Sequence, residues 1–291
     1  MELISKTVPV NFNLFLFGDT HLGNSHVSHS GLHRVIDMVN CEYVGCTANY
    51  AVHFGDAIES ILVNDPRYRP DNCKDLYEDD RRKFPTVFKQ MDDVERLLKP
   101  IRGNLVTILK GNHEDKLWAV GNITRRITDT LKVPYGSFAC KVAFHDKRGN
   151  LLFKGFFEHG RKSISSTADD PRRREENMRL ILKRQLKEKA GDCVLMAKGH
   201  THRLLVVDPT PRLYLRDDGH EIKDSYTQAA HTDRYIPSDD RWYVNTGGFM
   251  RLYKAGEESY AELADYDPME LGFAIVRVRD RVIQGIDKVT I

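Results

Sequence analysis

The sequence predicts an α/β protein in which buried strands alternate with amphipathic helices. Short apolar runs rich in β-branched and aromatic residues recur along the chain, and several end at Gly, Asp or His. The clearest run is 105–109, which leads into Gly111-Asn112-His113-Glu114. Segments such as 31–40 carry apolar residues at helical spacing between these runs. Because open α/β sheets bind ligands at the carboxyl ends of their strands, we expect the functional site there.

The N-terminal part is predicted to begin with a β-α-β unit whose strands end in acidic turns. Its first strand ends at Gly18, which frees the backbone to turn, and its second ends at Gly55-Asp56. A later helix is stopped by Pro100. The expected elements are a strand over 8–17, a helix over 31–40, a strand over 50–54, a helix over 87–98 and a strand over 105–109.

The C-terminal part continues the alternation of strands and one long helix. The helix is predicted to begin at Pro171, behind the acidic cap Asp169-Asp170, and to end at Gly191. The expected strands are 138–144 and 151–157, which form a hairpin, then 194–197, 242–244, and a closing hairpin of 273–278 and 281–283.

Two polar segments interrupt this pattern and predict insertions in one domain spanning 1–291. The segment 64–85 is rich in turn formers, and 203–240 contains the hairpin signal Asp218-Gly219. We expect substrate specificity to reside in these insertions.

Composition excludes several classes of protein. A hydrophobic fraction of 41% with 30% charged residues is ordinary for a globular protein, and the net charge of +2 gives no global signature of DNA coating. The five cysteines are scattered without CxxC spacing, so we expect reduced thiols rather than disulfides or a zinc knuckle. No signal peptide and no run of about 20 apolar residues is present, which predicts a cytoplasmic protein without a membrane partner.

Five predicted strand ends carry the residue types that bind metals and take part in acid–base catalysis. Singly they are ambiguous, because Asp56 suits a helix N-cap and a lone His suits a surface turn. Together they supply five His, two Asp and one Asn, a set that suits a two-metal phosphoester hydrolase, since carboxylates and neutral imidazoles bind Mn, Fe or Zn. The five stretches are Gly18-Asp19-Thr20-His21, Gly55-Asp56, Gly111-Asn112-His113-Glu114, Glu158-His159-Gly160 and Gly199-His200-Thr201-His202.

In order, these stretches read GDTH, GDAIES, GNHE, HG and GHTH between residues 18 and 202. The series resembles the calcineurin-like metallophosphoesterase superfamily. The resemblance implies a four-layer α/β/β/α sandwich of two mixed β-sheets flanked by helices, with two divalent ions at one edge. Manganese is the expected metal, with iron, zinc or nickel as alternatives. By motif position, the implied ligands are Asp19, His21, Asp56 and His202 for one ion, and Asp56, Asn112, His159 and His200 for the other.

The resemblance also implies that Asp56 bridges the ions and that His113 faces the leaving group. Two ions about 3.5–4 Å apart clamp the attacking and leaving oxygens and acidify a shared water, so a metal-bridged hydroxide would attack the phosphorus. His113 would then be the general acid. We expect Glu114 to orient the His113 imidazole as an outer carboxylate.

The substrate stays open at this point, with phosphodiesters favoured. GDAIES lacks the Asp-Arg-Gly continuation of the Ser/Thr protein phosphatases, which argues against that branch. One alternative is a DNA or RNA nuclease using 161–190, where ten basic side chains outnumber five acidic ones. Another is a small-molecule phosphomonoesterase. A non-catalytic scaffold would lack ligands or the acid, and none is missing here. The sequence leaves the oligomeric state open.

Overall fold

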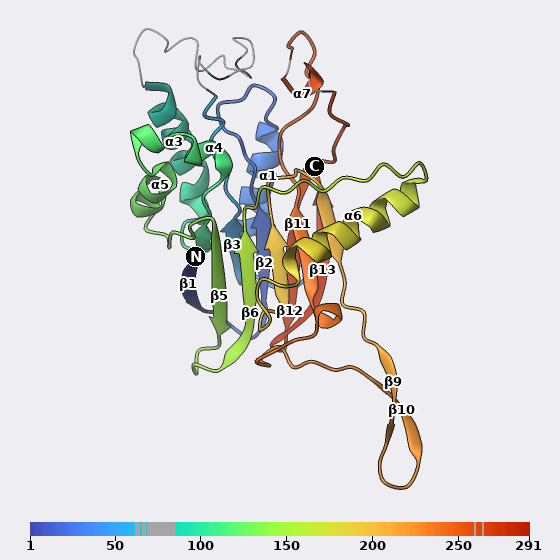
Figure 1. Cartoon of the computed structure of the whole chain (residues 1–291). Coiled ribbons are helices and arrows are strands. Elements are labelled where there is room, and N and C mark those ends of the chain that lie inside the picture. Colours follow the sequence, from blue (N-terminus) through green and yellow to red (C-terminus); the bar gives the residue numbers. More distant parts are fainter. Residues whose placement is uncertain (62–64, 66–67, 69–84, 259, 264) are drawn as a thin grey trace.

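Two β-sheets packed face to face form the centre of the molecule (Figure 1). The structure is a computed structural model that describes all residues except 62–64, 66–67, 69–84, 259 and 264. The predicted insertion 64–85 therefore lies almost wholly outside the described residues.

The five-stranded sheet has the order β13-β12-β2-β3-β4. Strands β2, β3 and β4 are parallel, and β12 pairs antiparallel with both β2 and β13. Its strands are β2 (Phe12–Phe17), β3 (Asn49–His53), β4 (Leu105–Ile108), β12 (Gly272–Arg279) and β13 (Val282–Thr290). All five lie within or beside the predicted runs.

The six-stranded sheet has the order β1-β5-β6-β7-β11-β8 and is also mixed. Strands β1 and β8 were not predicted: β1 precedes the predicted strand 8–17, and β8 begins the predicted insertion 203–240. The members of this sheet are β1 (Glu2–Thr7), β5 (Ala139–His145), β6 (Leu151–Glu158), β7 (Leu195–Lys198), β8 (Leu204–Val207) and β11 (Trp242–Thr246).

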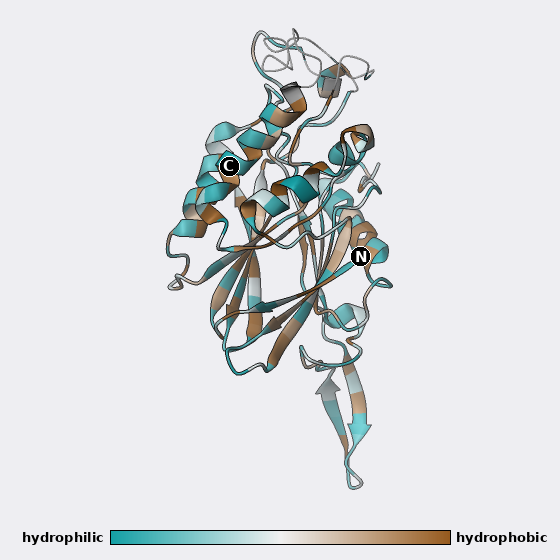
Figure 2. Cartoon of the chain, turned by 90° about the vertical axis from the view of Figure 1, so that its left-hand side faces the viewer, coloured by the Kyte–Doolittle hydropathy of each residue, from teal (hydrophilic) through white to brown (hydrophobic). Residues whose placement is uncertain are grey.

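Side-chain alternation along β2 shows how the layers form. Leu14 and Leu16 join the core between the two sheets, whereas Phe15 and Phe17 join the core beneath the helices. This follows from the period of two in a strand, which sends successive side chains to opposite faces. A third apolar cluster covers the outer face of the six-stranded sheet. The predicted four-layer α/β/β/α sandwich is confirmed, with apolar strands inside and polar stretches on the outer helices (Figure 2).

Among the described residues, the outer layers contain four longer helices. Three pack on the five-stranded sheet, and α6 packs on the other sheet through its buried Met178, Leu182 and Leu186. The side chain of Asp170 caps α6 as predicted, but the helix ends before the predicted stop at Gly191. The four are α1 (His29–Asn40), α3 (Pro85–Leu98), α5 (Ile123–Leu131) and α6 (Pro171–Leu186).

The predicted Asp218-Gly219 hairpin forms β9 (Leu213–Asp217) and β10 (Ile222–Tyr226). It projects from the body at the end opposite the short helix α4 (Asn112–Asp115), as Figure 1 shows. Four cysteines in the described part are free thiols. Among the described residues, no helix has the length and apolar character needed to cross a bilayer.

Candidate metal centre

The predicted site residues follow the carboxyl ends of five strands drawn from both sheets. β2, β3 and β4 come from one sheet, and β6 and β7 from the other. Face-to-face packing brings these ends to one edge of the sandwich. Among the described residues, three side-chain groups there have the spacing to hold a metal ion: Asp19 with His21 and His202, Asp56 with His159 and His200, and His21 with Glu59 and His113.

The backbone at this edge adopts a conformation that L-residues avoid. Five predicted ligands have positive φ: Asp19 at 52°, His21 at 43°, Asp56 at 47°, His200 at 77° and His202 at 53°. Left-handed backbone at a non-glycine residue costs about 1–3 kcal/mol and concentrates at functional sites. These tight turns bring the five side chains together at one edge of the sandwich.

Glycine is required where two of the turns meet. A Cβ atom at Gly111 would lie 2.1 Å from the backbone N of Asp56. The turn after β4 therefore lies directly against the turn after β3, and no larger residue fits at this position. The contact lets the backbone N–H of His113 donate to Oδ1 of Asp56 at 2.8 Å.

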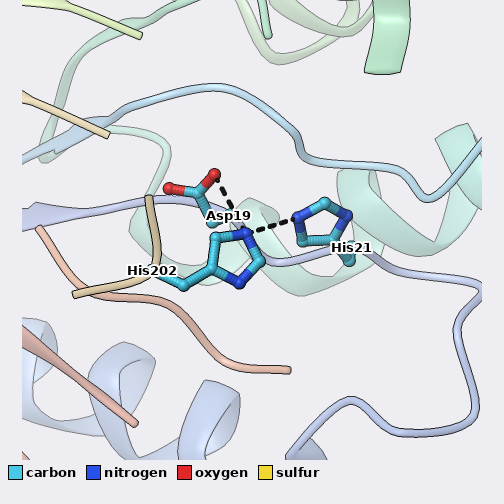
Figure 3. A group of neighbouring side chains, drawn as sticks. All are labelled: Asp19, His21 and His202. Carbon is cyan, nitrogen blue, oxygen red and sulfur yellow. Dashed lines mark hydrogen bonds and ion pairs between the residues drawn. The ribbon is translucent and has the colours of Figure 1, made fainter. Parts of the chain in front are cut away.

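In the first group, three side chains point toward one another (Figure 3). The Nε2 atom of His202 lies 3.1 Å from Nε2 of His21 and 3.5 Å from Oδ1 of Asp19. The backbone N–H of His200 donates to Oδ2 of Asp19 at 2.9 Å and fixes that carboxylate.

In the second group, His159 contacts two oxygen donors. Its Nε2 lies 3.2 Å from Oδ2 of Asp56 and 2.9 Å from Oδ1 of Asn112. The same Asp56 oxygen is 4.0 Å from Nε2 of His21, which belongs to the first group. Oδ2 of Asp56 therefore faces both groups, while Oδ1 is used by the backbone of His113.

Hydrogen bonds made by Nδ1 of two imidazoles leave Nε2 as the nitrogen that faces the centre. Nδ1 of His21 donates to Oε2 of Glu59 at 2.8 Å, and Nδ1 of His159 donates to the carbonyl of Phe54 at 2.6 Å. Each donation leaves Nε2 with the lone pair that a metal requires. Nδ1 of His200 and of His202 are buried without a hydrogen-bond partner among the described residues. Bound cations would suit this donor set.

Burial makes the charges here interdependent. It raises the pKa of Asp19 to about 7. Burial by itself lowers the pKa of His21 and His159, but Glu59 and Asp56 respectively outweigh it and raise both values to about 9. The pKa of Asp56 stays well below its usual range because His159 and His113 oppose the effect of burial. Without a metal, protons on imidazoles neutralise the carboxylates; a cation would replace those protons.

Glu114 differs in its contacts from the expectation that it orients His113. Its Oε1 accepts from the backbone N–H groups of Ala57 and Ile58 at 2.5 and 3.2 Å, and its Oε2 accepts from Gly111 at 2.9 Å. It therefore ties the turn after β3 to the turn after β4.

Glu59 makes the contact to the His113 ring instead. Nδ1 of His113 donates to the carbonyl oxygen of Glu59 at 2.5 Å, and the Glu59 carboxylate holds His21. The sequence pattern did not single out Glu59, which stands in the stretch GDAIES. The sequence signal for it is a carboxylate three residues after Asp56.

The centre opens into a cavity of about 450 Å³, a size typical of small-molecule sites. Asp56, Asn112, His113, His200 and His202 contribute to its wall. A cavity of about 610 Å³ adjoins it and shares Asn112 and His200.

Comparisons with known proteins add little to this geometry. No family model and no curated protein matches the sequence. Among solved structures, the nuclease MPE of Pseudomonas putida has a TM-score of 0.29 and 10% identity, covering 95% of this chain and 87% of that one. At such values the likeness carries no conclusion about function.

Proposed function

We propose that this chain is a phosphoesterase with two metal ions, of the calcineurin-like metallophosphoesterase superfamily, with phosphodiesters as the favoured substrates. The observation that carries the proposal is the position of Asp56 Oδ2, which faces His159 at 3.2 Å and His21 at 4.0 Å. A carboxylate oxygen between two imidazole-rich groups is suited to bridge two ions. The five left-handed backbone positions support the same proposal.

The proposed ligands divide between the two groups around that oxygen. Manganese is the favoured metal, because neutral imidazoles and carboxylates bind it and the closely related divalent ions. When bound, the ions supply Lewis acidity and an acidified water. Asp19, His21, Asp56 and His202 would hold one ion, and Asp56, Asn112, His159 and His200 would hold the other.

His113 is the proposed general acid. His113 lines the 450 Å³ cavity, and its Nδ1–H donates to the carbonyl of Glu59, so in the imidazolium form Nε2 carries the second proton, which it would pass to the leaving oxygen. Glu59 acts as a positioning residue for His113 and His21, and Glu114 as a positioning residue for the turn that carries Asp56.

A direct test compares hydrolysis of bis-p-nitrophenyl phosphate with that of p-nitrophenyl phosphate. The protein is stripped with a chelator and then given Mn²⁺, and His113→Ala serves as the inactive control. We expect Mn-dependent turnover, faster on the diester and lost in His113→Ala. Preference for the monoester would favour the phosphomonoesterase alternative, and no turnover on either substrate with two Mn²⁺ bound would overturn the proposal.

A further inference from the structure

We propose that Trp118 and Arg161 form a platform for the nucleotide beside the scissile phosphate, which makes single-stranded nucleic acid the substrate of this centre. The inference rests on the proposed phosphodiesterase function and adds the substrate class to it.

Trp118 is an unusually exposed aromatic side chain close to the centre. It is 81% exposed and begins the 3-10 helix Trp118–Val120, a few residues after α4, which carries Asn112 and His113. An indole left in water gives up the favourable burial of a large apolar surface. A flat ring at a fixed place suits stacking on another flat ring, and every nucleobase offers one.

The cavity beside Trp118 connects it to the proposed metal centre. Its volume is about 610 Å³, enough for a nucleotide-sized ligand. Because Asn112 and His200 line both this cavity and the central one, a phosphate at the centre has its neighbouring nucleotide within the Trp118 cavity. The full lining is Asn112, Asp115, Lys116, Trp118, Arg161 and His200.

The charges in this cavity suit a phosphate. Asp115 accepts from Lys110 at 2.6 Å and from Arg161 at 2.8 Å, so two cations share one carboxylate. The Arg161 side chain is 66% exposed. A guanidinium carries five donors, and the Asp115 contact uses only the Nη2 end of this one. Arg161 is therefore placed to bind a backbone phosphate next to a base on Trp118.

A second cavity connected to the central one indicates a chain rather than a mononucleotide. The central cavity shares Ser165 with one of about 730 Å³ along α6. Its wall includes the basic side chains Lys183, Arg184, Lys187 and Arg212. Shared lining residues thus link three cavities, and each outer one has cationic groups: Arg161 in one, and Arg184 and Lys187 in the other, where Lys183 and Arg212 pair with Asp239. A polynucleotide fits such a set of linked cavities because it presents a phosphate at each step.

The aromatic platform also distinguishes single strands from duplexes. In a duplex each base is already stacked and paired, so its face is not available to an exposed indole. Single-strand sites pair aromatic side chains with a basic groove, the combination seen around Trp118.

The test uses the Mn-loaded protein and two substrates, bis-p-nitrophenyl phosphate and a labelled oligo(dT) of about twelve nucleotides, a length within the range of single-strand sites. Losing the stacking of one base on an aromatic ring corresponds to about a 5- to 150-fold loss of affinity. We expect Trp118→Ala to lower kcat/KM for oligo(dT) by that order through KM, and much more than for the small diester. Trp118→Phe should restore most of the loss. Tyr226→Ala, an exposed aromatic change on the distant β9–β10 hairpin, is the matched control.

Separate outcomes distinguish this inference from the proposed function. Hydrolysis of the small diester without cleavage of oligo(dT) would overturn only the nucleic-acid inference. Equal losses on both substrates in Trp118→Ala would assign the indole a structural role and also overturn it. Equal rates on oligo(dT) and on its duplex with oligo(dA) would overturn the inference that the substrate is single-stranded. Absence of hydrolysis of bis-p-nitrophenyl phosphate would overturn the proposed function itself.

Discussion

The carboxylate of Glu59 accepts a 2.8 Å hydrogen bond from Nδ1 of His21, while both side chains are buried. The same residue accepts through its carbonyl oxygen from Nδ1 of His113. One residue thus sets the ring orientation of a proposed metal ligand and of the proposed general acid. Glu59 orients His21 through its charged carboxylate and His113 through its backbone carbonyl.

This arrangement predicts that Glu59→Gln weakens metal binding. The amide is nearly isosteric but neutral, so it no longer raises the basicity of His21, and loss of such an outer partner costs about 10- to 100-fold in metal affinity. The proton path through His113 should survive, because that contact is made by the backbone. Calorimetric titration with Mn²⁺, followed by kcat at saturating metal, separates the two effects. Unchanged affinity with a large loss in kcat would contradict the assignment.

His113→Gln should abolish proton donation and leave the ligands in place. We expect kcat on bis-p-nitrophenyl phosphate to fall by about 100- to 10,000-fold, the usual contribution of a positioned acid. Bound Mn²⁺, measured by elemental analysis, should be unchanged. Substantial metal loss in this variant would instead place His113 among the ligands.

Glu114→Gln should act mainly on stability. Its carboxylate accepts from three backbone N–H groups across two turns, and an amide nitrogen turned toward one of them would leave a buried donor unpaired. We expect a lower Tm by thermal unfolding and a smaller loss of kcat than in His113→Gln. Equal and severe kinetic losses in both variants would contradict this division of roles.

Asp56→Asn tests the bridging position. The change removes the charge from the one oxygen that faces both ligand groups, so we expect binding of both ions to weaken together. Elemental analysis after desalting measures the bound Mn²⁺ per chain. Asp37→Asn, an exposed carboxylate on α1, is the control. Loss of only one ion from Asp56→Asn would show that the residue serves a single site.

Metal-free protein should lose stability between pH 6.5 and 9. The folded pKa values of His21 and His159 are raised to about 9 from an ordinary 6.5. Their stabilisation is therefore full below pH 6.5 and is lost as the pH rises through 9. The raised pKa of Asp19 acts in the same direction from 3.8 to about 7.

The measurement for that prediction is Tm across this pH range after chelation. Mn-loaded protein is the comparison, because its ligands are already deprotonated and its Tm should fall less. A Tm of metal-free protein that rises with pH would contradict the assigned partners of the two imidazoles.

The sequence by itself determined the strands and the residues that follow them. Apolar runs ending at Gly, Asp or His were enough to place β2, β3, β4, β6 and β7, because burial on both faces leaves a continuous apolar signal. The same reasoning located the cap of α6 at Asp170 and the hairpin turn at Asp218-Gly219, since both depend on short-range backbone chemistry.

Only the tertiary structure decided which strand joins which sheet and what each polar atom contacts. β1 escaped prediction because its side chains are half-buried or exposed and form no apolar run, and β8 because its short apolar run Leu204–Val207 opens the otherwise polar segment 203–240. The roles of Glu59 and Glu114 depend on how the turns after β3 and β4 meet at Gly111. That contact joins residues more than fifty positions apart, and no local pattern in the chain encodes it.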